Sequence, residues 1–205
     1  MISFEEIRQF LPTFLSQGSE TAFLDEIKHF LASESRPFYS SALAVHSTLF
    51  QGDGLEGLLV INLPDETIGK AAVLLFSNTC DVNPENTRFF PTHVSYSPIF
   101  PLDRYLDALR RSYSAERVKT YEEAVRQQLV TQIFFLPKGG KLTGDSLVFL
   151  DRTLSSSATT IDPKTVSDIR LFALSDFGAW LFALKLSIHF CRIRDRVDRL
   201  AGTVA

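Results

Sequence analysis

The chain has 205 residues, of which 45% are hydrophobic and 22% are charged, and this composition excludes a wholly disordered protein. Its net charge of −3 leaves no basic surplus, so nucleic acid is an unexpected partner. Two cysteines, Cys80 and Cys191, are too few for a disulfide framework or a four-cysteine zinc site. We therefore expect a cytoplasmic protein without metal or cofactor, and the lack of a long apolar run predicts no membrane span. The 18 phenylalanines indicate a phenylalanine-rich core or an apolar docking face.

Two short amphipathic helices are predicted at the start of the chain. Ser3 and Glu6 form a capping box, and apolar residues then recur at helical spacing. Gly18 separates this helix from a second one, which Pro37 ends. The sequence therefore predicts an N-terminal helical extension over residues 1–40, a helical hairpin packed against a larger domain that covers residues 41–205.

Short runs of apolar and β-branched residues predict a sheet in the larger domain. Turn sequences rich in Gly, Asp, Asn and Pro separate these runs. The expected strands are 42–50, 57–63, 71–76, 93–99, 133–136 and 147–150. The segment 71–76 shows no alternation, which favours a central strand covered on both faces. The pattern predicts an α+β protein with a small, strongly bent sheet or barrel.

Helical patterns interrupt and close this sheet. Residues 101–128 are predicted to form an insertion of two helices, joined by a polar and unconstrained stretch. Exposed polar loops are preferred sites of proteolysis, and the candidate cleavage positions in this one are Ser112, Tyr113, Ser114 and Ala115. Residues 155–165 form a second soft stretch. A closing helix is expected over 176–200, where Lys185, Ser187 and His189 predict a narrow solvent-exposed stripe.

The densest polar segment, residues 77–83, follows the most buried of the expected strands. Two interpretations of Cys80 stay open: a nucleophile with His93 or His46 as its base, or a small buried residue in a tight turn. In the second case Asn78, Asp81 and Asn83 hydrogen-bond the turn. Cys80, Asp81 and His93 lack the spacing of a metal site, so none is expected there.

Several segments resemble the MazF/PemK toxin family. Gln51-Gly52-Asp53 before a strand, then residues 71–78 and 94–100, are similar to the core of that family. Residues 147–154 and 170–186 resemble its later strand and closing helix. The resemblance covers Thr48 to Leu186, with 101–128 as an insertion. It implies a small SH3-like β-barrel with appended helices, a cytoplasmic dimer and RNA cleavage.

The positions that match the family's catalytic groups hold no catalytic chemistry here. The family places an Arg, which stabilises the phosphate in the transition state, where this chain has Ala71. Its catalytic Thr or Ser follows a Pro-Ile pair, and here Phe100 follows that pair. Lys70 is one residue away and faces the opposite side of a regular strand. The departures predict a non-catalytic protein. The alternative is an active endoribonuclease with a relocated site built from Lys70, Ser77, Asp81 and His93.

A barrel without catalytic groups still offers a groove and a helical surface for a partner. The size of this chain, its lack of the family's catalytic groups and its two polar loops are compatible with the MazF-homologous subunit of type III CRISPR-associated Lon protease systems. That subunit holds a sigma factor inactive until a protease cuts it. The resemblance implies a protein-binding adaptor or inhibitor in an antiviral defence operon, with a protease and a sigma-like regulator as partners and a homodimer as a further option. The candidate partner-binding residues are Asn78, Asp81, Asn83, Trp180, Leu184, Arg192 and Arg196. In the alternative interpretation, the two arginines lie on a solvated helix end whose charged residues pair with one another.

Overall fold

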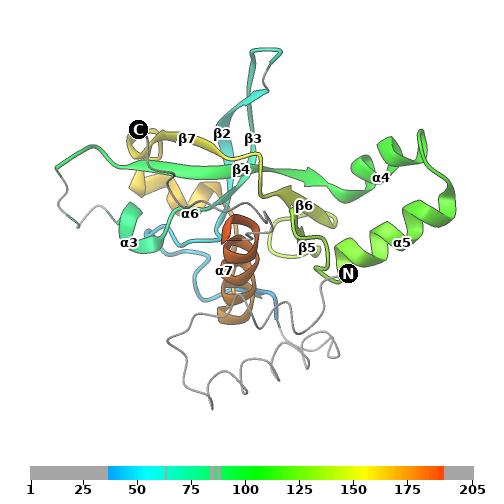
Figure 1. Cartoon of the computed structure of the whole chain (residues 1–205). Coiled ribbons are helices and arrows are strands. Elements are labelled where there is room, and N and C mark those ends of the chain that lie inside the picture. The colour runs from blue at the N-terminus through cyan, green and yellow to red at the C-terminus, as the bar shows by residue number, and fades with distance from the viewer. Residues whose placement is uncertain (1–36, 63, 84–85, 87–88, 192–205) are drawn as a thin grey trace, which may run out of the picture.

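The computed structural model describes residues 37–62, 64–83, 86 and 89–191 (Figure 1). The expected helices before residue 37, together with Arg192 and Arg196, lie outside these residues. The described part is an α+β protein whose strands are β1 (Tyr39–Ser40), β2 (Gly54–Asn62), β3 (Thr67–Leu75), β4 (His93–Pro101), β5 (Ile133–Leu136), β6 (Ser146–Phe149), β7 (Leu154–Ser157) and β8 (Arg170–Leu174). Its helices are α3 (Thr79–Val82), α4 (Leu102–Arg110), α5 (Ala115–Arg126), α6 (Val166–Ile169) and α7 (Asp176–Cys191), with 3₁₀ turns η1 (Ala158–Thr160) and η2 (Pro163–Thr165).

The strands form one antiparallel sheet in the order β1-β8-β2-β3-β4-β6-β5, with β7 beside β4. Strand β4 runs across the molecule (Figure 1) and has β3 along one edge. Its other edge is shared, because residues 93–96 pair with β7 and residues 99–101 pair with β6. The sheet begins at β1, which pairs with β8. It therefore starts two residues before the expected domain boundary at residue 41.

The two ends of the sheet order are linked through the loop that follows β5. The Tyr39 hydroxyl in β1 donates a hydrogen bond to the Pro137 carbonyl at 2.6 Å. The Lys141 amide donates to the Leu171 carbonyl in β8 at 2.8 Å. These bonds satisfy backbone groups that a sheet edge would otherwise leave open, and they bend the sheet so that its first and last strands lie close together.

The second half of β3 is buried on both faces, as its lack of alternation predicts. Val73 and Leu75 pack with Tyr96 against the region of η1, η2 and α6. Leu74 and Phe76 point to the opposite face, into the cluster that α7 covers. All of these side chains are at most 5% exposed. Successive side chains of a strand alternate between faces, so this segment joins the two clusters.

The helical insertion is present as α4 and α5, and it packs on a third cluster beside β5 and β6. The expectation of an unconstrained connection between the helices is wrong. The amides of Ser112 and Tyr113 both donate to the Leu109 carbonyl at 3.0 Å. The Ser114 side chain caps α5 by accepting from the Arg117 amide. The connection is a short hydrogen-bonded turn because each helix end satisfies its own unpaired groups.

The strand expected over residues 42–50 does not form, and these residues make turns instead. The reason lies in a distant residue, since the carbonyls of Leu43, His46 and Thr48 all accept hydrogen bonds from the Arg170 guanidinium. A buried guanidinium needs several acceptors that converge on one point. Carbonyls turned inward in this way cannot take part in a strand ladder.

Three strands, β1, β7 and β8, were not expected from the sequence. Strand β7 occupies the start of the stretch 155–165 that was expected to be soft, and it pairs with β4 from His93 to Tyr96. Strand β8 precedes α7, which begins at Asp176 as predicted. The serines of β7 have low strand propensity, and the pairing with β4 overrides that local preference.

Candidate functional site

The two positions matched to the family's catalytic groups lie on neighbouring strands. In the register of β3 and β4, Val73 pairs with Pro98 and Leu75 with Tyr96. The paired residues end at Val73 and Pro98, two residues short of Ala71 and Phe100. Neither Ala71 nor Phe100 carries a group that transfers a proton or stabilises a phosphate.

Phe100 belongs to an aromatic cluster that also holds a cation. Its ring contacts the Phe149 ring edge-on, with centroids 5.6 Å apart, and the Tyr105 ring lies 5.4 Å beyond. The Arg152 guanidinium sits 4.0 Å from the Phe149 centroid and 5.5 Å from the Phe100 centroid. A cation over aromatic faces is attracted by their electron-rich surface. Sequence reasoning missed Arg152, because only the pairing of β4 with β6 brings it to Phe100.

The residues proposed for a relocated site are spread along the sheet. Lys70 lines a cavity of about 440 Å³ together with Glu56, Ser156 and Asp162. Ser77 lies seven residues further along the chain, on the order of 20 Å for an extended strand. The Ser77 hydroxyl accepts a hydrogen bond from the Ser95 amide at 2.8 Å. A relocated site would use the Lys70 cavity or the Ser77 end of β3, since the two are too far apart to act together.

The polar segment after β3 forms α3. Asn78 caps this helix by accepting from the Cys80 amide at 2.9 Å, as a turn residue is expected to do. Cys80 is exposed, so the interpretation as a small buried residue is wrong: the cap holds the Cys80 amide and leaves the side chain outside. Asp81 is also exposed. His93 lies exposed at the start of β4, opposite Ser157.

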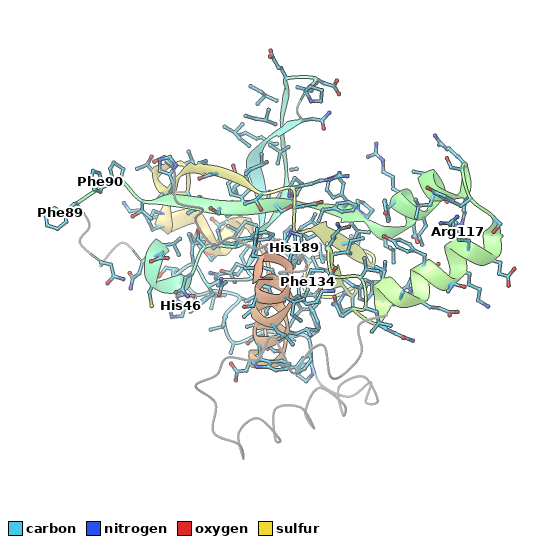
Figure 2. The ribbon with its side chains drawn as sticks, in the orientation of Figure 1. His46, Phe89, Phe90, Arg117, Phe134 and His189 are labelled. Atoms are coloured by element: carbon cyan, nitrogen blue, oxygen red, sulfur yellow. The ribbon has the colours of Figure 1, made fainter. Side chains whose placement is uncertain are left out.

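Asn83 borders a mostly apolar opening near this segment. It lines a cavity of about 510 Å³ with Val82 and Pro91. The loop that forms part of the cavity wall carries Phe89, which is fully exposed, and Phe90, which is 83% exposed. Both side chains point away from the body of the molecule (Figure 2). Neighbouring large apolar side chains in solvent mark an interaction surface, and part of the phenylalanine excess is used there.

Helix α7 contributes mainly to the core. Trp180 and Leu184 are half-buried, and Trp180 packs with the cluster under α7. Lys185 was expected on a solvent-exposed stripe but is buried. Its ammonium donates to the carbonyls of Gln128 and Val130 at 2.7 and 2.6 Å. Burial lowers the pKa of Lys185 to about 7. The polar stripe is interrupted because this lysine ties α7 to the end of the helical insertion.

A buried ion pair joins Arg170 and Asp53. The Arg170 guanidinium donates to the Asp53 carboxylate at 2.9 and 3.1 Å, and neither side chain is exposed. The Phe50 amide donates to the same carboxylate oxygen at 2.9 Å. Burial raises the pKa of Asp53, and the Phe50 amide and the guanidinium act in the opposite direction. We assign the pair a structural role, since it fixes the turns of residues 42–50.

Three further findings concern metal binding, membrane spanning and similarity to known families. In the described ranges, no group of three or more His, Cys, Asp and Glu side chains is arranged to hold a metal ion. No helix in that part of the chain is long and apolar enough to cross a membrane. No protein-family model matches the chain, and no curated protein sequence matches it.

Proposed function

We propose that this chain is a non-catalytic, protein-binding adaptor built on a MazF-like, SH3-like barrel. The observation that carries the proposal is the pair of positions Ala71 and Phe100. They lie on the neighbouring strands β3 and β4, and Phe100 is packed against Phe149 and Arg152. A methyl group and a phenyl ring there support a binding protein, because RNA cleavage needs proton transfer and charge stabilisation.

The barrel assignment is supported by the contacts that link the ends of the sheet. The Tyr39–Pro137 and Lys141–Leu171 hydrogen bonds draw β1 and β8 to the loop after β5. Sheet curvature of this kind is a step towards closure. We place the adaptor in the cytoplasm, as a monomer or homodimer.

The partner is proposed to dock on the exposed phenylalanines. Phe89 and Phe90 directly precede Pro91, which lines the cavity with Asn83, and burying each ring on a partner would contribute about 2 kcal/mol. We propose a regulatory protein such as a sigma factor as the partner, held inactive and released by proteolysis in an antiviral defence operon.

The test is capture of a candidate sigma factor by the purified full chain. The variant with Phe89→Ser and Phe90→Ser should lose capture while its unfolding midpoint stays unchanged, since both rings are exposed. Val45→Ser is the matched control, because Val45 is also exposed at 84% but lies on another segment. Equal capture by the double variant and the wild type would contradict the docking surface.

A relocated ribonuclease site is the second candidate, favoured by the Lys70 cavity. Two carboxylates, Glu56 and Asp162, line that cavity with the lysine, which is a set able to donate and accept protons. RNA cleavage by the wild type that is lost in Lys70→Ala would replace the adaptor proposal. If only the variant with Ala71→Arg and Phe100→Thr cleaves RNA, the chain is a toxin fold whose catalytic groups were lost.

A further inference from the structure

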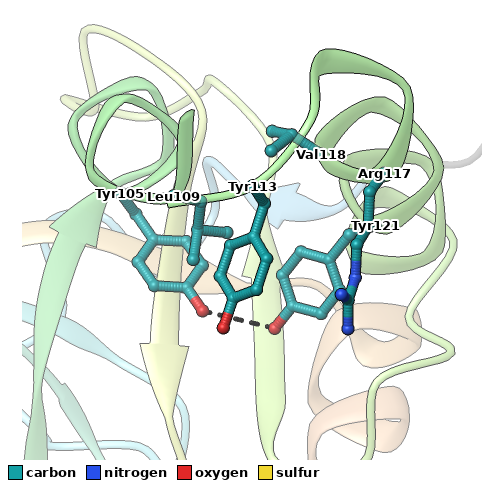
Figure 3. Close-up of a pocket in the computed structure, with 6 residues that line it drawn as sticks. All are labelled: Tyr105, Leu109, Tyr113, Arg117, Val118 and Tyr121. Carbon is teal, nitrogen blue, oxygen red and sulfur yellow. Dashed lines mark hydrogen bonds between the residues drawn. The ribbon is translucent and has the colours of Figure 1, made fainter. Parts of the chain in front are cut away.

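The helical insertion contains a pocket that the proposed function does not use. It has a volume of about 250 Å³ and lies between α4 and α5 (Figure 3). Its lining residues are Tyr105, Leu109, Tyr113, Arg117, Val118 and Tyr121. Val118 is buried at 2% exposure and, with Leu109, provides an apolar wall. In Figure 2 the insertion, marked by Arg117, lies at the opposite end of the molecule from Phe89 and Phe90.

Three phenol groups line this pocket side by side. The hydroxyls of Tyr105, Tyr113 and Tyr121 point in the same direction (Figure 3). Those of Tyr105 and Tyr121 share a hydrogen bond of 3.3 Å, and a shared bond uses one of the two protons. The other proton is available to an acceptor. Burial and the Tyr105 hydroxyl raise the pKa of Tyr121, so the phenol stays protonated and able to donate.

Arg117 adds a positive charge at the same place. Its guanidinium lies 4.8 Å from the centroid of the Tyr113 ring. Two other arginines of the insertion are neutralised, because Arg110 pairs with Asp107 and Arg126 pairs with two carboxylates. Within the described residues no ion pair includes Arg117. No carboxylate lines the pocket either. The polar side of the pocket therefore presents donors and a cation, which is the complement of an anion.

We infer that this pocket binds a small amphipathic anion, a ring-sized apolar group that carries one carboxylate or phosphate. The apolar group would lie against Leu109, Val118 and the tyrosine rings, and the anionic oxygens would accept hydrogen bonds from the phenols and Arg117. The volume is adequate, since a cavity of roughly 150 Å³ already admits benzene. This inference does not depend on the adaptor proposal, because it uses another part of the fold.

The test is titration of the full chain with phenylacetate and with phenyl phosphate, followed by calorimetry and by amide chemical shifts. We expect saturable binding of at least one probe, with shifts confined to α4 and α5, and the tighter probe identifies the anion. Arg117→Gln should weaken binding about tenfold, the usual effect of losing a charged hydrogen bond. Tyr121→Phe should weaken it by a smaller factor, and Arg110→Gln, the matched control, should leave it unchanged.

Three outcomes would overturn the inference. The first is the absence of saturable binding of either probe to the wild type. The second is an Arg117→Gln variant that binds as the wild type does, since Arg117 is exposed and its replacement leaves the core intact. The third is equal affinity for benzyl alcohol, a neutral probe of the same ring size, which would reduce the pocket to an apolar hollow.

Discussion

At the residue scale, two buried cations hold segments that have no regular structure. Arg170 donates to carbonyls in the turns of residues 42–50, and Lys185 donates to those of Gln128 and Val130. Carbonyls in irregular segments lack the ladder partners of a sheet, so a buried donor has to satisfy them. The conformation of each segment therefore depends on one side chain far away in sequence.

Arg170→Met should destabilise the protein strongly, because it leaves the Asp53 carboxylate buried without its partner. We expect a loss of about 3–5 kcal/mol in the free energy of unfolding, measured by urea denaturation. Arg110→Met removes an exposed ion pair with Asp107 and should cost less than about 1 kcal/mol. Similar losses in the two variants would mean that the buried pair is not what holds residues 42–50.

Lys185 should make stability depend on pH. Burial lowers its pKa from the ordinary value of 10.5 to about 7, so between these values the unfolded chain binds a proton that the folded chain does not. Stability should rise with pH through this window by about 1 kcal/mol per unit, and below pH 7 the cost of the buried charge is fully present. Lys185→Met should abolish this rise, whereas Lys119→Met, on the exposed face of α5, should keep it. Denaturation midpoints at pH 6, 8 and 10 measure it.

At the element scale, the outer edge of β5 is closed by a side chain. Gln128 donates from its amide to the Phe135 carbonyl at 2.7 Å and accepts from the Phe135 amide at 3.0 Å. The amide group thus imitates the backbone of a further strand, which covers an edge that otherwise invites pairing with another chain. Gln128 adopts φ +58° to do so.

Gln128→Ala should therefore expose the edge of β5. We expect a loss of about 2 kcal/mol in stability, because both backbone groups of Phe135 lose their partner. The exchange of the Phe135 amide should accelerate, and a tendency to associate should appear in sedimentation. Gln127→Ala is the neighbouring control and should change none of these. An unaltered exchange rate at Phe135 in Gln128→Ala would refute the role of this side chain.

The turn between α4 and α5 remains the expected first site of limited proteolysis. Its residues are exposed, and a cut there leaves every strand pair intact, whereas a cut within residues 155–164 disrupts β7 and its pairing with β4. With trypsin, mass spectrometry should show cleavage at Arg110, Arg111 or Arg117 first. The hydrogen-bonded turn should make this cleavage slow. A first cut at Lys164 would reverse the expected order.

At the scale of the whole molecule, the bend of the sheet depends on close contact between its two ends. Tyr39 of β1 lies over Gly139 in the loop after β5, where a β-carbon would come within 2.5 Å of the Tyr39 ring. A glycine at this position lets the loop approach β1, so that the Tyr39 hydroxyl reaches the Pro137 carbonyl. The core under α7 is closed by this contact.

Gly139→Ala should separate the two ends of the sheet. We expect a loss of about 1–3 kcal/mol, since the added methyl group displaces the Tyr39 ring. Gly144→Ala is the matched control on the same connection, because a β-carbon there meets open space, and it should be neutral or slightly stabilising. Equal stabilities of the two variants would mean that the contact does not constrain the sheet.

The sequence by itself determined the elements whose signals are local. The central strand 71–76 follows from its unbroken apolar run, the helices of the insertion from the spacing of their apolar residues, and the start of α7 at Asp176 from its pattern. These features need only the periodicity of side chains and the chemistry of turns.

Only the tertiary structure decided which polar groups meet. Arg170 lies 117 residues from Asp53, and its guanidinium converts an expected strand into turns. Arg152 reaches Phe100 through strand pairing, and Lys185 leaves an apparent polar stripe to enter the core. The physical reason is that a buried donor is satisfied by whichever acceptor the fold places nearest. Such a pairing leaves no periodic trace in the chain.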